Sequence, residues 1–250
     1  MDFRAALLKQ TESFGELVRS GDPSTPVPTC PDWTLKQLFR HFGRGNRWAA
    51  QIVAERRSVT LDPREVMGGK PPDDPEAAID WLNDGARLII KAVDQVGSDA
   101  RVWTFLGPRP AGWWIRRRLH EATVHRADAA LALGVPYELS PELAADGISE
   151  WLERVSVEAN RHGRAPLHRG QTVHLHASDD GLGPTGEWTV FNDEDGVWWS
   201  HDHGKGSVAL RGPAKNLFLA VVRRGTAADL DVKIFGDTAV WDNWLERTPF

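Results

Sequence analysis

The chain has 250 residues, of which 41% are hydrophobic and 26% charged, and a formal net charge of -5. This composition is typical of a globular protein with its own core, in one large or two modest domains. The slight acidity argues against nucleic acid or an anionic membrane as a partner. Cys30 is the single cysteine, so no internal disulfide can form, and no apolar run is long enough to span a membrane. The opening segment lacks a signal-peptide pattern, and we expect a cytoplasmic protein.

The first half of the chain has the apolar spacing of amphipathic helices. Thr34 with Gln37 forms a capping-box pattern at the start of one of them, and Pro75 suits the first turn of another. Gly134 and Pro136 end the last. We expect helices at residues 3–18, 34–57, 75–97 and 113–133. Four helices of this length with loops between them predict an antiparallel four-helix bundle over residues 1–138.

The second half changes character after Pro141. A further helix at residues 141–160 is followed by alternating apolar and polar segments, separated by Gly-rich and Asp-rich turns such as ASDDGLGPTG. We expect strands at residues 173–177, 187–191, 197–200, 208–210 and 230–235, and helices at residues 213–224 and 238–245. Residues 139–250 are therefore predicted to form a small α+β domain, with an antiparallel sheet covered by helices on one face. The fold class of the whole chain is α+β.

The segment from Arg118 to Asp128 carries the most informative chemistry. Glu121 and His125 are four residues apart, so they lie about 40° apart around a helix and can ligate one ion. His120 and His125 diverge by about 140° and cannot share a site through the helix. The spacing also departs from the HExxH zinc-protease motif, because the second histidine comes one residue too late.

A third ligand must come from another helix, and His41 is the best candidate because it lies beside apolar helix positions. Two histidines and one carboxylate would leave an open metal position, as catalytic zinc sites do. From spacing alone, the alternative that these are ordinary hydrogen-bonding helix residues is favoured.

Two segments resemble one known family. The run PTCPDWTLKQLFRH, ending at His41, and the run HEATVHRAD over residues 120–128 are similar to the mycothiol-dependent maleylpyruvate isomerase family. The resemblance implies a DinB-like N-terminal bundle and a sterol-carrier-like C-terminal domain. It further implies that His41, Glu121 and His125 bind Zn²⁺ or another divalent metal, with mycothiol as the thiol cofactor. The residues that would bind the thiol itself are not identified.

The same resemblance implies an activity. A metal-activated thiol would be transferred to a small electrophile, or would assist its cis–trans isomerisation. A basic residue of the C-terminal domain would hold the substrate carboxylate; Arg224 is the candidate, with Arg223 second. A surface arginine near a helix C-terminus is the competing interpretation. We expect an actinobacterial protein that acts on small molecules as a monomer or small homo-oligomer.

Two other classes of function stay open. One is a zinc-dependent hydrolase that uses metal-bound hydroxide on the same scaffold. The other is a non-catalytic ligand-binding protein that keeps the fold.

Several further residues have competing interpretations. Asp128 either orients a ligand histidine or, as the sequence favours, pairs with a neighbouring arginine. Cys30 is interpreted as structural, and residues 116–118, three arginines, as a solvated helix face.

A second group of histidines falls in the C-terminal half. His174 and His176 alternate along a predicted strand and, with His201 and His203, could form a second metal site. An exposed polar strand face is favoured, because no carboxylate or cysteine spacing supports a metal.

Overall fold

The computed structural model describes residues 1–249, and the chain divides into two compact units. The first is Met1–Tyr137, and the second begins at Glu138. Within residues 1–249, no helix combines the length and apolar character that a membrane crossing requires.

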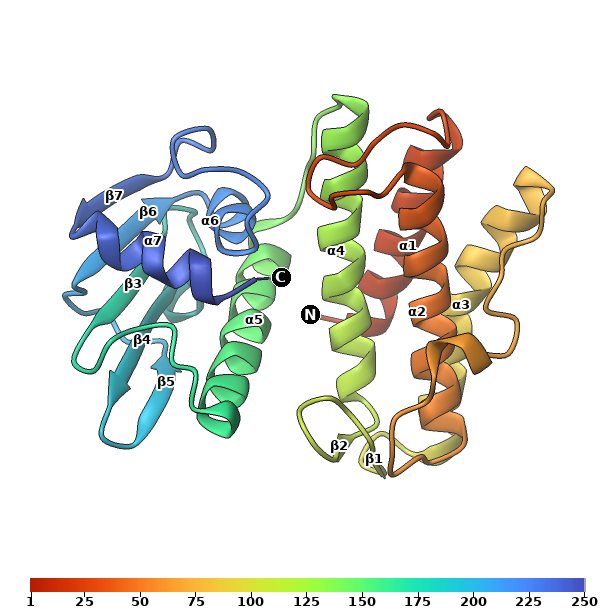
Figure 1. Cartoon of the computed structure of the whole chain (residues 1–250), viewed down its shortest axis with the longest axis horizontal. Helices are drawn as coiled ribbons and strands as arrows, with labels where there is room; N and C mark the ends of the chain where they lie inside the picture. Colours follow the sequence, from red (N-terminus) through yellow and green to blue (C-terminus); the bar gives the residue numbers. More distant parts are fainter. Residues whose placement is uncertain (250) are drawn as a thin grey trace. The chain divides into compact units, whose positions relative to one another are not determined.

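The first unit contains four long helices that run side by side (Figure 1). α2 packs mainly against α3, and α1 packs against α4. A single 3₁₀ turn and one short antiparallel strand pair complete the unit. The elements are α1 (Phe3–Arg19), α2 (Leu35–Ala54), η1 (Pro63–Glu65), α3 (Pro75–Val96), β1 (Arg101–Val102), β2 (Arg109–Pro110) and α4 (Trp113–Leu133). Its core is built from buried side chains on the facing helix stripes, including Phe14, Leu38, Phe42, Leu82 and Ile89.

Local signals fix where α2 begins and how closely it approaches α3. The Thr34 backbone N–H donates to Gln37 Oε1 at 2.7 Å, which satisfies a donor that the helix leaves unpaired. Further along, Gly43 faces Trp81, and a Cβ atom there would lie only 2.1 Å from the indole ring. Glycine therefore permits the close approach of the two helices beside His41.

The second unit is a five-stranded sheet with helices, in the order β5-β4-β3-β6-β7. The predicted α+β class is confirmed, and the sheet is mostly antiparallel. The elements are α5 (Pro141–His162), β3 (Thr172–Ala177), η2 (Gly183–Gly186), β4 (Glu187–Asp193), β5 (Gly196–Ser200), β6 (Val208–Gly212), α6 (Ala214–Val221), β7 (Lys233–Gly236) and α7 (Thr238–Arg247).

One strand pair departs from the expected antiparallel sheet, because β3 and β6 are parallel. β5 lies at one edge, whereas β6 lies beyond β4 and β3, so residues 201–207 must cross the sheet to join them. Parallel neighbours always need such a crossover. This connection has no helix, and it folds over one face of the sheet.

The opposite face of the sheet carries the apolar core of this unit. Leu175 and Trp188 are cross-strand partners and fully buried. The indole N–H of Trp188 donates to Ser149 Oγ at 2.9 Å, which places α5 over this face. α6 also packs against β3 and β6.

Candidate metal centre

The three candidate ligands come together between α2 and α4 of the first unit. His41 extends from α2, whereas Glu121 and His125 lie one turn apart on α4. One donor atom from each of the three lies within 4.8 Å of the other two. The rings of His41 and His125 meet edge to face, with centroids 5.1 Å apart. The sequence spacing predicts the shared helix face of Glu121 and His125, whereas the third donor, His41, is the one that the family resemblance implies.

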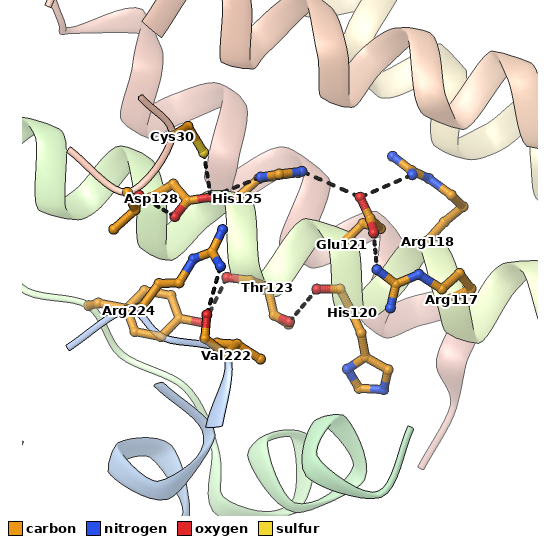
Figure 2. Close-up of polar contacts among 12 residues, drawn as sticks. Cys30, Arg117, Arg118, His120, Glu121, Thr123, His125, Asp128, Val222 and Arg224 are labelled. Carbon is orange, nitrogen blue, oxygen red and sulfur yellow. Dashed lines mark hydrogen bonds and ion pairs between the residues drawn. The ribbon is translucent and has the colours of Figure 1, made fainter. Parts of the chain in front are cut away.

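A hydrogen bond at Nδ1, on the side of the ring away from Glu121, holds the imidazole of His125. Its Nδ1 lies 2.9 Å from Asp128 Oδ2, and its Nε2 lies 3.3 Å from Glu121 Oε2 (Figure 2). The fully buried Asp128 also accepts from Thr29 Oγ1 at 2.5 Å and from Cys30 Sγ at 3.7 Å. Asp128 thus has the geometry of a carboxylate that orients a ligand histidine. The Cys30 thiol donates to the same oxygen that His125 Nδ1 approaches, and Cys30 is not one of the three convergent donors.

The sequence-based expectation for the arginine triplet is wrong at two of three positions. Arg117 and Arg118 are buried, because both face Glu121: Arg117 forms an ion pair with Oε1, and Arg118 Nη1 lies 3.5 Å from Oε2. Arg118 also donates to Asn46 Oδ1 at 2.8 Å. Its burial, and secondly the charge of Arg117, lower the pKa of Arg118 to about 9.

The surroundings of His41 disfavour its charged form. Loss of hydration, followed by the positive fields of His125, Arg118 and Arg44, lowers the pKa of His41 from 6.5 to about 3. Asp128 opposes this shift. Although His41 is exposed, its ring packs against Trp33 with centroids 4.8 Å apart. The imidazole is therefore neutral at physiological pH, as a metal ligand must be.

A cavity of about 430 Å³ opens beside His41 and Glu121. Its wall combines arginine side chains with aromatic rings, and includes Arg40, Arg44, Arg117, Trp33, Trp48 and Trp114. Such a wall attracts an anion and shields it from water. The arginines of α4 were missed from the sequence as site residues. The available signal was the four-residue spacing of Arg117 and Glu121, which allows an ion pair on one helix face.

His120 does not join the centre, as its spacing predicts. It is buried on α4, and its ring points away from Glu121 and His125 (Figure 2). It therefore offers a matched control for substitutions at His125.

Arg224, the candidate for carboxylate binding, lies in the second unit just after α6. Arg223 adopts a left-handed backbone conformation with φ of 62°, and the Arg224 N–H donates to Leu219 O at 2.7 Å. This is the six-to-one bond of a Schellman turn, which reverses the chain at the helix end. Arg224 is buried with Nη1 bonded to Val222 O at 2.7 Å, whereas Arg223 is exposed.

Comparison with known proteins identifies the family. Residues 4–130 match the family described as mycothiol maleylpyruvate isomerase N-terminal domain, and residues 142–243 match the corresponding C-terminal domain. The chain belongs to the mycothiol maleylpyruvate isomerase family. The resemblance of the two sequence segments is thereby confirmed.

Solved structures agree with this assignment at the level of the fold. The chain is similar to the crystal structure of a mycothiol-dependent maleylpyruvate isomerase, with a TM-score of 0.58, 14% identity, and coverage of 90% of this chain and 89% of that one. A histidine-to-alanine mutant of that enzyme gives a TM-score of 0.56 and 13% identity at the same coverage. No curated protein shows significant sequence similarity to the chain.

Proposed function

We propose that this protein is an enzyme that activates a low-molecular-weight thiol of the mycothiol class at a divalent metal, with zinc preferred. The proposal rests on the convergence of His41, Glu121 and His125, the first two of which line a cavity, in a member of this family. Two imidazoles and one carboxylate suit zinc and leave room for a further ligand. When bound there, a divalent cation would lower the pKa of a coordinated thiol and favour the thiolate at neutral pH.

The surrounding residues keep the donors in the state that a metal requires. Asp128 fixes the proton of His125 on Nδ1, so the Nε2 lone pair faces Glu121. The low pKa of His41 keeps that ring neutral. Arg117 pairs with Oε1 of Glu121, whereas Oε2 lies 3.3 Å from His125 Nε2 and 3.5 Å from Arg118 Nη1. Each contact favours metal binding over protonation of the donors.

The cavity favours a small anionic electrophile, such as an unsaturated carboxylate. Arg40 and Arg44 supply positive charge, and the neighbouring tryptophans exclude water. A thiolate would add to an electrophilic carbon to form a C–S bond. That addition would break the π bond of the C=C unit and leave a carbanion. Rotation about the resulting C–C single bond, followed by expulsion of the thiolate, would give the geometric isomer, whereas protonation of the carbanion by solvent would give a thioether. We propose that Arg224 holds the substrate carboxylate.

Metal content tests the first part of this proposal. Zinc bound by the purified chain should fall by about one ion per chain in His125→Ala, because a ligand and its orientation are lost. His120→Ala removes another buried histidine from the same helix and should leave that zinc in place. Equal zinc content in the wild type and His125→Ala would refute the metal centre.

Thiol dependence tests the second part. Maleylpyruvate, or a related cis-unsaturated acid, is incubated with the protein and with mycothiol. Isomerisation regenerates the thiol, transfer consumes it stoichiometrically, and hydrolysis proceeds without it; the last outcome would refute the proposal. Arg224→Ala should raise KM for the acid about 10-fold or more, as expected for loss of a charged contact. The matched change at its exposed neighbour, Arg223→Ala, should have little effect.

A further inference from the structure

A second cluster of metal-binding side chains lies wholly within the second unit. His174 Nε2 is 2.7 Å from Glu187 Oε2, His176 Nδ1 is 2.5 Å from Oε1, and His203 Nδ1 is 3.2 Å from Oε1. Donor atoms of His174, Glu187 and His203 all lie within 4.8 Å of one another. Three imidazoles thus surround one carboxylate.

Strand register brings His174, His176 and Glu187 together. His174 and His176 share a face of β3 because side chains alternate along a strand. Glu187, the first residue of β4, is the cross-strand partner of His176. This face is opposite to the one that carries Leu175 and Trp188, so the cluster lies away from the α5 side of the sheet.

The crossover connection, residues 201–207, contributes His203 to the cluster. It is tied to the sheet at both ends: His201 Nδ1 lies 2.7 Å from Glu187 O, and Ser207 N–H donates to Thr172 Oγ1 at 2.8 Å. Between them, Thr189 Oγ1 donates to Asp202 O at 2.7 Å. These bonds hold His203 over the carboxylate and cover His174, which is only 5% exposed although it faces away from α5.

The cluster has the charge and the access that a cation needs. Glu187 supplies the carboxylate of the cluster, and its two oxygens face the imidazoles of His174, His176 and His203. Arg211 is in register with His176 on β6, but its side chain is exposed, where solvent screens its charge. The His203 side chain is 76% exposed and provides a path for an ion to enter.

We propose that His174, Glu187 and His203, with His176 adjoining, form a second binding site for a divalent transition metal of the zinc class. Imidazole with a single carboxylate is the donor set that zinc, copper and nickel prefer, whereas calcium and magnesium prefer oxygen. The ligands come from two strands and from the crossover connection. A bound ion would therefore pin residues 201–207 to the sheet, and this site is independent of the proposed thiol activation.

Zinc titration of the full chain tests this site, with competition from a chromophoric chelator as the readout. The background is His125→Ala, which disables the centre in the first unit. It should retain about one zinc ion per chain, and adding His203→Ala should weaken that affinity at least ~10-fold. The exposed His168, outside both clusters, is the matched control: His168→Ala should leave the affinity unchanged.

A second variant and a second readout keep the test independent of folding. Glu187→Gln retains a hydrogen-bonding side chain but removes the charge, and should also lose the ion. In the His125→Ala background, Zn²⁺ should slow amide hydrogen exchange within residues 201–207, and His203→Ala should abolish that protection. The proposal is overturned if the background binds no zinc, or if its zinc affinity is the same with and without His203. If the wild type and the His125→Ala background bind the same amount of zinc, that result instead contradicts the proposed metal centre on α4.

Discussion

Substitution of Asp128 by asparagine isolates the charge that holds His125 in place. Asp128 accepts hydrogen bonds at both oxygens, from Thr29 at Oδ1 and from His125 and Cys30 at Oδ2. Asparagine has nearly the same shape but only one acceptor oxygen, so it can serve only one of these sides. We expect the imidazole of His125 to be less well oriented and less basic in this variant. Loss of such an orienting partner typically costs about 10–100-fold in metal affinity, or about 1.4–2.8 kcal/mol.

The assay is zinc competition against a chromophoric chelator at neutral pH, with urea unfolding of the metal-free chain as a measure of stability. Thr29→Val is the matched control, because it removes a donor to Asp128 but leaves the carboxylate and its bond to His125. Its zinc affinity should stay within a few-fold of the wild type. Unchanged zinc affinity in Asp128→Asn, or an equal loss in both variants, would show that the Asp128 charge does not orient His125.

Three further predictions concern other parts of the same unit. In the metal-free chain, His41 has a folded-state pKa of about 3 against an ordinary 6.5, so between these values the unfolded state binds more protons. The free energy of unfolding should therefore fall as the pH drops from about 6.5 to about 3. His41→Gln should reduce this pH dependence, which urea unfolding at pH values above and below that range measures. Gly43→Ala places a methyl group against Trp81 and should cost about 1–3 kcal/mol in unfolding free energy; an unchanged urea midpoint would contradict the close approach. Cys30→Ala should keep metal and activity, because the thiol donates to the orienting carboxylate and is not one of the three candidate ligands; complete loss of turnover with metal retained would identify a nucleophile instead.

Local signals allowed most elements to be predicted from the sequence. The α2 capping box, Pro75 at the start of α3 and Gly134 at the end of α4 are short-range features, and each acts where it was expected. The four-residue spacing of Glu121 and His125 likewise sets their shared helix face, whatever the rest of the fold does.

Features that depend on distant packing were not predicted. The apolar and polar alternation of β6 gives its faces but not its neighbour, so the parallel pairing with β3 was missed. The contact of Glu187 with the histidines of β3 was not predicted for the same reason. Local residue spacing does not determine which residues of two neighbouring strands lie opposite each other. Arg118 was expected in solvent because arginine rarely lies buried. Asn46, on another helix, accepts one of the hydrogen bonds that offset the loss of hydration of its guanidinium.

Anomalous X-ray diffraction from zinc-loaded crystals of the full chain can show whether His41, Glu121 and His125 bind a metal ion. Data collected above and below the zinc absorption edge locate the ion without reference to activity. We expect an anomalous difference peak at bonding distance, about 2.0–2.2 Å, from a donor atom of each of the three residues. Zinc-loaded crystals with no peak between α2 and α4 would contradict this expectation.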